Sequence, residues 1–234
     1  MSNPPITAAP IVNNTEPAHA LGPEPLTGKH ITLEHLAEKH IPDLWENIGT
    51  HTDLWTWWPE GPFTESEFST NMKEFSTFMA ESLAVYAVLL NSGPHKNKAI
   101  GLVMGLSESR DSNRIAELGA FFGPLLRKSR AATEALFIVG DRLFELNHRR
   151  LGWKTNSLNR ASRNCAERFG FLYEGTFRQD QINKGRNRDS VSYSIVDSEW
   201  PMCKKALELW LDDENFDGQD KQRRTLMETR ESLK

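Results

Sequence analysis

The sequence predicts an α/β fold, with a mixed, mostly antiparallel sheet of about six or seven strands flanked by helices. Two observations predict it. Apolar residues recur with period 2 in some segments and at helical spacing in others, and the two patterns alternate along the chain. The composition agrees, because 38% hydrophobic and 26% charged residues in a chain of 234 are typical of a globular protein.

Both ends of the chain differ in composition from the middle. Residues 1–28 hold six of the twelve prolines and show no apolar periodicity, so we expect a disordered Pro-rich arm. Residues 212–234 carry seven acidic and five basic residues, which predicts a charged C-terminal tail with at most a marginal helix. The core domain is therefore predicted to span residues 29–211, without an internal repeat or a second domain.

The first half of the core is predicted to hold a strand, two helical segments and three more strands, at 30–36, 41–48, 65–80, 83–90, 99–106 and 115–122. The turn residues Asn91–Pro94 follow a continuous apolar run, and a second strand pattern begins shortly after them. These two strands are therefore predicted to form an antiparallel hairpin. Gly123 and Pro124 end the last strand of this half.

The second half alternates helix and strand, at 131–146, 150–157, 160–169, 171–177, 188–196 and 202–211. The helix at 131–146 has the clearest pattern, because Ala135, Leu136, Val139 and Leu143 fall on one face. Alternation of this kind after an antiparallel start implies a mixed sheet covered by helices. The segment 202–211 is either a final helix at the edge of the domain or part of the charged tail.

Charge and cysteine content exclude several classes of protein. The chain has 28 basic and 32 acidic residues, a net charge of −4, which argues against bulk nucleic-acid binding. No apolar run approaches the ~18–20 residues of a membrane helix. Two cysteines cannot make a disulfide framework, and the first residues lack the pattern of a secretory signal. We therefore expect a cytoplasmic protein that binds neither membrane nor nucleic acid.

A short basic loop precedes the helix that is predicted to begin at Ala131. The first turn of a helix presents free N–H groups and the positive end of its dipole, which suit an anion. Arg127, Lys128 and Arg130 add positive charge, and the small side chains of Ala131 and Ala132 let a phosphate approach the backbone. A pyrophosphate fits this loop. The alternative is a solvated basic loop that caps an ordinary helix.

Several short motifs follow one another in a characteristic order: Pro62-Phe63, Glu117-Leu118-Gly119, Asn159-x-x-Ser162, Gly170-Phe171 and Glu174-Gly175. In this order the sequence resembles the GNAT acetyltransferases, and within them the ribosomal-protein N-acetyltransferase (RimJ/RimL-like) branch. The resemblance covers about residues 29–200. It implies the GNAT acyl-CoA N-acyltransferase fold and an enzyme that moves the acetyl group of acetyl-CoA to an amine by direct attack, without a metal.

The resemblance also implies which residues bind acetyl-CoA as cosubstrate: Phe122, Leu125, Arg127, Lys128, Ser129, Arg130, Ala131, Ala132, Thr133, Asn159 and Ser162. One position departs from the family pattern, because Arg130 stands where the pyrophosphate loop usually has glycine. If that position needs a positive φ, arginine there is strained. Alternatively, the Arg130 side chain extends outward and contacts a phosphate.

Direct transfer needs a neutral amine, a polarised thioester carbonyl and a proton for the departing thiolate. The resemblance implies that backbone N–H groups at residues 120–122 polarise the carbonyl, and that Ser162 donates the proton. Ser162 could instead serve only the start of its helix, with Asn159 as N-cap. Glu117 is the candidate base, acting through a water, unless it faces solvent. Asp180 is a weaker alternative, and Cys165 is expected to be buried rather than nucleophilic.

The acceptor is an amine, either a protein N-terminal α-amine or a small molecule. Trp57 and Trp58 are candidate walls of its site, although aromatic residues in such number are more often core. The basic turn Lys184–Arg188 lies where relatives meet their acceptor, or is simply a hairpin turn. Two other functions fit the sequence: a non-catalytic CoA-binding GNAT-like module, and a nucleic-acid-associated protein that uses the two basic segments.

Overall fold

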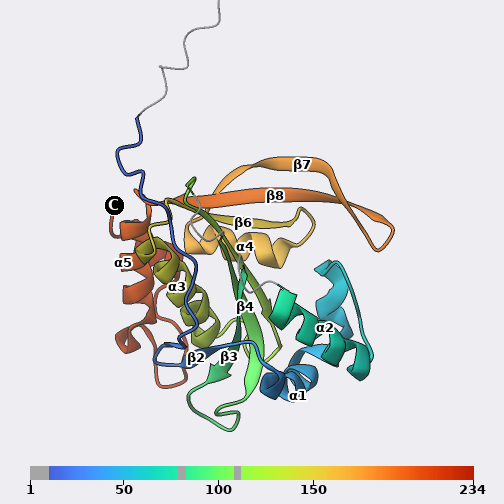
Figure 1. Ribbon diagram of the computed structural model, residues 1–234. Coiled ribbons are helices and arrows are strands. Elements are labelled where there is room, and N and C mark those ends of the chain that lie inside the picture. Colours follow the sequence, from blue (N-terminus) through green and yellow to red (C-terminus); the bar gives the residue numbers. More distant parts are fainter. Residues whose placement is uncertain (1–10, 79–82, 108–111) are drawn as a thin grey trace, which may run out of the picture.

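The computed structural model describes residues 11–78, 83–107 and 112–234 (Figure 1). The described strands are β1 (Leu26–Thr27), β2 (Ile31–His35), β3 (Leu83–Leu90), β4 (Ala99–Ser107), β5 (Ile115–Phe122), β6 (Arg150–Asn156), β7 (Leu172–Asn183) and β8 (Arg186–Val196). The α-helices are α1 (Ile41–Leu44), α2 (Glu65–Phe78), α3 (Arg130–Glu145), α4 (Arg160–Phe169), α5 (Trp200–Leu211) and α6 (Leu226–Glu231). Short helical turns are η2 (Glu38–His40), η3 (Trp45–Gly49), η4 (Thr52–Trp57) and η5 (Asp213–Asn215).

The strands described form one sheet of eight, in the order β1-β2-β3-β4-β5-β6-β8-β7. Strands β5 and β6 run parallel, and the other neighbouring strands run antiparallel. The predicted mixed, mostly antiparallel sheet and its β3–β4 hairpin are therefore confirmed. The sheet exceeds the expected six or seven strands because the two residues of β1 pair with β2.

Helices cover the two faces of the sheet unequally. Helices α3 and α5 lie on one side of it and α1 and α2 on the other (Figure 1). Alternate residues of the central strands enter two separate apolar clusters. On β4, for example, Val103 packs in the cluster of α3 and α5, whereas Leu102 and Met104 pack in the cluster of α1 and α2. Beyond β5 the second cluster ends, and the face of β6, β8 and β7 on that side carries mainly polar residues, with Phe177 exposed beside Lys154.

Local signals set the ends of the two helices nearest the site. The side chain of Ser129 accepts a hydrogen bond from the N–H of Ala132 and caps α3. Asn159 caps α4 in the same way, by accepting from the N–H of Ser162. Gly170 ends α4 in the left-handed conformation, at φ 106°. Asn159 was predicted as a cap, and the structure confirms it.

The β7–β8 hairpin extends further than predicted, because its strands continue to Asn183 and begin again at Arg186. Lys184 and Gly185 both have positive φ, at 49° and 71°, and this conformation makes a tight turn that keeps the strands paired. The turn alternative for this basic segment is therefore the observed one. The end of the hairpin lacks apolar alternation, so period 2 could not reveal it.

The described parts of both chain ends contact the domain. In the expected arm, the N–H of His19 donates to the carbonyl of Leu146, and Ala18 is fully buried. In the tail, Phe216 and Leu226 enter the core cluster of α3 and α5. Residues 11–28 and 212–234 thus differ from a free arm and a free tail, because scattered apolar residues find partners that are distant in sequence. Residues 1–10 lie outside the described part of the chain. No helix in the described ranges has the length and apolar content needed to cross a membrane.

Candidate functional site

A gap opens in the sheet between the two parallel strands. Strand β5 pairs with β6 over three residues only, ending at Glu117 opposite Gly152. From there β5 continues to Phe122 along β4, whereas β6 continues to Asn156 along β8. The two strands therefore diverge. The backbone at residues 120–122, which was predicted to polarise a thioester carbonyl, borders this gap.

The turn into α3 follows directly from the diverging end of β5. Lys128 has a φ of 59°, so the strained position of the loop lies there and not at Arg130, which has helical conformation. The backbone N–H groups of Arg130 and Ala131 have no acceptor in the described part of the chain. Ala132 donates instead to Ser129. The first turn of α3 thus keeps two free donors, and its small residues leave the approach open.

The charged residues of this turn point in different directions. The side chain of Arg127 is 48% exposed and lies 3.7 Å from Asp53, and Lys128 is exposed beside it. Arg130 differs from the prediction, because its side chain is only 11% exposed and bonds to Asp213 and Asp220 in the tail. Arg127 and Lys128 remain available to a pyrophosphate, and the guanidinium of Arg130 does not.

The other predicted loop residues divide between surface and core. Leu125 is exposed and Phe122 is half-buried at the end of β5. Thr133 is buried, and its hydroxyl oxygen accepts a hydrogen bond from Arg168 at 3.2 Å. Leu125 and Phe122 can line the cofactor, whereas the hydroxyl of Thr133 serves the contact between α3 and α4.

Ser162 lies in the first turn of α4 and contacts β6. Its hydroxyl oxygen accepts a hydrogen bond from the indole N–H of Trp153 at 3.0 Å. Because an indole N–H only donates, this bond uses a lone pair of Ser162 and leaves the hydroxyl proton free. Trp153 belongs to the apolar cluster of α3 and α5. Ser162 therefore approaches the gap from the face that carries α3.

Glu117 lies at the point where β5 and β6 separate, on the opposite face of the sheet. Its neighbours Ala116 and Leu118 pack toward α3, and alternation turns Glu117 the other way. Burial raises the pKa of Glu117, and the positive charges of Lys154, Arg188 and Arg150 partly oppose that shift. The alternative of a solvent-facing side chain does not hold, because Glu117 is half-buried.

Gly152 leaves space above Glu117. A Cβ atom at that glycine would lie 3.9 Å from the Cβ and Cγ of Glu117, so a longer side chain would cover the carboxylate. Alternation along β6 then places Arg150 and Lys154 on the same face. Arg150 pairs with Glu174 at 2.5 Å, and Lys154 pairs with Asp180 at 2.9 Å.

These ion pairs and the serines of β8 make the open face of the sheet polar. Arg150 and Lys154 were not predicted as site residues, although the period-2 pattern of β6 carries a signal for both. Arg188 belongs to the predicted basic turn Lys184–Arg188. Asp180, the weaker alternative base, is engaged with Lys154, and hydrogen bonds from Ser190 and Lys154 lower its pKa. Glu117 therefore has the properties of a base more fully than Asp180.

Of the two tryptophans that were predicted to line the acceptor site, Trp58 is packed and Trp57 is exposed. Trp58 stacks on Phe121 of β5 with ring centres 4.6 Å apart, whereas Trp57 is 38% exposed. The amino group of Lys184 donates to the carbonyl of Trp55 at 2.7 Å, which fastens the β7–β8 turn to η4. The hairpin in Figure 1 accordingly reaches toward the side of α1 and α2. The hairpin turn therefore contacts the same helical segment that carries Trp57.

The properties of the two cysteines agree with direct transfer, in which no acyl-enzyme forms on a thiol. Burial raises the pKa of Cys165 to about 11, so it carries almost no thiolate at neutral pH. Burial also raises the pKa of Cys203. Among the described residues, no group of three His, Cys, Asp or Glu side chains could hold a metal ion.

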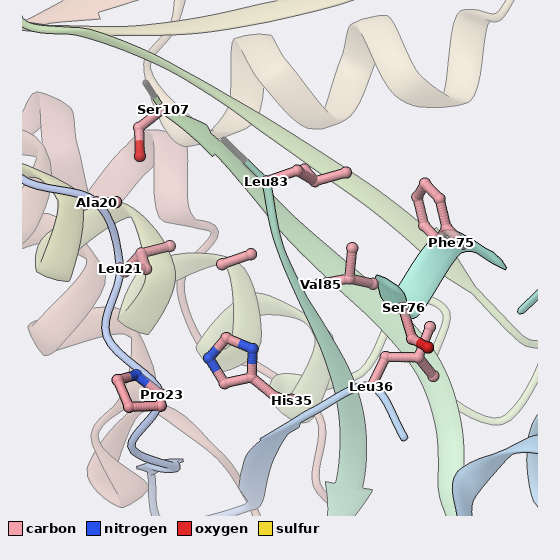
Figure 2. A pocket seen from close by; sticks show the side chains of 11 residues that line it. Ala20, Leu21, Pro23, His35, Leu36, Phe75, Ser76, Leu83, Val85 and Ser107 are labelled. Atoms are coloured by element: carbon pink, nitrogen blue, oxygen red, sulfur yellow. The ribbon is translucent and has the colours of Figure 1, made fainter. Parts of the chain in front are cut away.

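A cavity of about 270 Å³ lies away from this site (Figure 2). The N-terminal segment at Leu21 and Pro23 forms one side of it, and Leu83 and Val85 of β3 form another. Ser107, also in its lining, is at the end of β4 opposite to Gly101, which pairs with Phe122. The cavity shares no residue with the predicted site.

Comparison with known proteins agrees with this geometry. The family described as "Acetyltransferase (GNAT) domain" matches residues 30–172. A GCN5-related N-acetyltransferase from Brucella melitensis is 34% identical, with a TM-score of 0.87 over 94% of this chain and 100% of that one. A GNAT-family protein from Chromobacterium violaceum is 32% identical, with a TM-score of 0.75 over 86% of this chain and 100% of that one.

The predicted RimJ/RimL-like branch stays a prediction. RimL, a ribosomal L7/L12 alpha-N-protein acetyltransferase, is 18% identical, with a TM-score of 0.64 over 74% of this chain and 94% of that one. This likeness shows the fold alone. A search of curated proteins found no match.

Proposed function

The chain belongs to the GNAT acetyltransferase family, and from that premise we propose that it acetylates a weakly basic amine, a protein N-terminal α-amine or a small-molecule amine of similar pKa. Acetyl-CoA is the donor in this family. One observation carries the proposal. The sheet opens where the half-buried Glu117 faces the positive charges of Lys154, Arg188 and Arg150, and Ser162 approaches the same gap from the other face.

The two faces separate the two substrates. The free N–H groups at the start of α3, with Arg127 and Lys128 beside them, would hold the pyrophosphate of acetyl-CoA. The amine would enter from the face of Glu117, Lys154 and Trp57. The gap between β5 and β6 joins the two faces, so the amine nitrogen and the thioester carbonyl would meet there in line.

Glu117 would accept a proton from the incoming ammonium through a water. Its raised pKa makes it a stronger base than an exposed glutamate. Ser162 would donate its free hydroxyl proton to the departing thiolate while Trp153 holds its oxygen. The proton that the attached nitrogen loses as the amide forms would restore the hydroxyl of Ser162. The oxygen of the tetrahedral intermediate would be stabilised by backbone N–H groups at residues 120–122.

The pKa of the acceptor favours an α-amine. An α-amine titrates at about 7.7–8.0 and a lysine side chain at about 10.4, so the α-amine loses its proton about two to three units more readily. A single half-buried carboxylate suffices for the first and is a weak base for the second. The RimJ/RimL-like motifs at residues 159–175 point the same way.

The test has two steps. Isothermal titration with acetyl-CoA, with ATP and NADH as comparison ligands, measures donor selectivity. Thiol release is then followed with a peptide bearing a free N-terminus and no lysine, with the same peptide blocked at its N-terminus and carrying one lysine, and with small amines of graded pKa. We expect selective binding of acetyl-CoA and turnover that falls as the amine pKa rises. Turnover confined to the lysine peptide would overturn the α-amine assignment, and absence of acetyl-CoA binding would overturn the proposal.

A further inference from the structure

Arg130 connects the cofactor turn to the C-terminal tail. Its Nη2 donates to Asp213 at 2.5 Å and to the carbonyl of Leu211 at 3.2 Å, and its Nη1 donates to Asp220 at 2.9 Å. The guanidinium also lies 3.9 Å above the ring centre of Phe216. Two carboxylates, a carbonyl and an aromatic face thus surround one side chain, which lysine could not reproduce because it lacks a planar fork.

The tail is also fastened to the far end of α4. Arg230 of α6 donates to the carbonyl of Arg168 at 2.9 Å, at the C-terminal turn of α4. Gly170 permits this contact, since a Cβ there would lie 3.0 Å from Nη1 of Arg230 and 2.8 Å from Sγ of Cys203. Leu226, which begins α6, is 1% exposed.

Between these two attachments, α3 and α4 touch through Arg168. Its guanidinium donates to the hydroxyl of Thr133 on α3 and lies 4.5 Å above the ring of Trp210, at the end of α5. The tail begins two residues after Trp210. It therefore runs from the start of α3 to the end of α4, the two helices whose first turns border the cofactor side of the gap.

The negative charges of Asp213 and Asp220 explain why an arginine at position 130 favours phosphate binding at the nearby turn. Asp213 and Asp220 lie beside a turn that offers its N–H groups to an anion, and their side chains are 64% and 67% exposed. Hydrogen bonds from Lys29 and then from Arg130 lower the pKa of Asp213 to about 2, so it is ionised at neutral pH. Without Arg130 these carboxylates would repel a phosphate at the same turn.

We propose that residues 212–234 form a clasp that sets the position of α3 relative to α4, and that Arg130 is its central positioning residue rather than a phosphate ligand. The clasp pre-organises the acetyl-CoA side of the gap and neutralises two carboxylates beside it. This inference rests on the proposed function, because acetyl-CoA binding is what the clasp controls. It also accounts for an arginine at a position where the family usually has glycine.

The decisive variant removes the carboxylates and keeps the arginine. In Asp213→Asn/Asp220→Asn the guanidinium loses its charged partners. If Arg130 is a positioning residue, the Kd for acetyl-CoA rises about tenfold, the KM for acetyl-CoA rises with it, and kcat and the KM of the amine stay unchanged. A released arginine that served as a phosphate ligand would instead tighten binding. Tighter or unchanged binding in this variant overturns the clasp.

A second pair of variants tests the neutralising role. Arg130→Met leaves Asp220 without its ion-pair partner and Asp213 with Lys29 alone, and it is expected to weaken acetyl-CoA binding more than Asp213→Asn/Asp220→Asn does. Combining all three substitutions removes the repulsion and is expected to recover part of the lost affinity. Failure of the triple variant to recover affinity would overturn the neutralising role. Lys221→Gln, an exposed change in the same tail, is the matched control and should bind as the parent does.

Hydrogen exchange distinguishes failure of the clasp from failure of the proposed function. In the parent, amides of residues 226–231 are expected to be protected, and the protection is expected to fall in Asp213→Asn/Asp220→Asn. A parent chain that protects this segment but does not bind acetyl-CoA would overturn the proposed function and the clasp's link to it. A parent that binds acetyl-CoA with an unprotected tail would overturn the clasp alone.

Discussion

The half of the sheet centred on β3 and β4 packs apolar residues on both faces, whereas the half formed by β6, β8 and β7 contributes to an apolar cluster on one face only. On β3, Tyr86 and Val88 pack toward α3, and Val85 and Ala87 pack toward α1 and α2. On β8, Tyr193 and Ile195 pack toward α3 and α5, but Ser192 and Ser194, which alternate with them, donate hydrogen bonds to the carboxylate of Glu174.

Because of this difference, one half of the sheet mainly stabilises the fold and the other half carries the groups that could act on a substrate. Burial of apolar area on two faces supplies most of the favourable free energy of the covered half. The open half lacks the second apolar layer, and its charged and hydroxyl groups can bind a polar ligand. Glu117 stands on the boundary between the two halves, at the last residue pair before β5 and β6 diverge and outside the apolar cluster of α1 and α2. Substitutions in each half therefore test this division.

The largest effect is expected at the boundary. Glu117→Gln should lower kcat/KM by about 10²–10⁴-fold, the usual contribution of a positioned base. In the parent, kcat/KM should fall as the pH drops through the raised pKa of Glu117, and this inflection should vanish in the variant. Stopped thiol-release assays over a pH series measure both. The exposed change Glu208→Gln is the control, and full activity in Glu117→Gln would move the base elsewhere.

Glu117→Gln should not destabilise the fold at neutral pH. The pKa of Glu117 is higher in the folded than in the unfolded chain, so the unfolded chain ionises first as the pH rises. The free energy of unfolding therefore falls across that pH interval, and glutamine avoids the loss. Urea unfolding at neutral pH should find the variant at least as stable as the parent. A less stable variant would mean that the carboxylate has a structural partner.

In the covered half, a core truncation should change stability and leave the chemistry alone. Leu102 is 1% exposed in the cluster of α1 and α2, and Leu102→Ala should lower the free energy of unfolding by about 2–5 kcal/mol. Ser192→Ala, on the open face, should cost less than about 1 kcal/mol. Denaturant unfolding of both variants gives the comparison. Equal losses would contradict the division between the halves.

A smaller effect on turnover is expected at Ser162. Because a thiol of pKa about 8.5–9 is already a good leaving group, Ser162→Ala should lower kcat only about tenfold. The Kd for acetyl-CoA should change little, and Ser162→Thr, which keeps the hydroxyl, should recover part of the rate. Single-turnover thiol release measures the chemical step. An unchanged rate in Ser162→Ala would assign Ser162 to the contact with Trp153 alone.

The smallest effect concerns an ion pair of the open face. The hydrogen bond from Arg150, with those from Ser194 and Ser192, lowers the pKa of Glu174 to about 2. The pair is largely solvated, so Glu174→Gln should cost less than about 1 kcal/mol at neutral pH. Since a lowered carboxyl pKa stabilises the fold only above it, parent and variant should converge as the pH falls toward about 2. Urea titrations at several pH values test this, and a difference that persists at the lowest pH would contradict it.

Some parts of the fold and the site could be predicted from the sequence, and others could not. Strands 83–90 and 115–122 and helix 160–169 were predicted with the bounds observed, because their residues repeat with one clear period. Asn159 was recognisable because a cap acts within its own helix. The direction of the Arg130 side chain could not be recognised in the same way. Its partner Asp213 lies 83 residues away, and the position of a residue in a helix does not determine which distant residue it contacts.

By itself, the sequence determined most of the strands and helices, the alternation of strand faces, the cap of α4 and the family. These follow from interactions between residues a few positions apart, which any chain with this local order would make. Only the tertiary structure decided that β5 and β6 diverge at Glu117, that Lys154 and Arg188 face that carboxylate and that the tail returns to Arg130. Such contacts depend on how distant elements pack, and no local period encodes which of many compatible surfaces will meet.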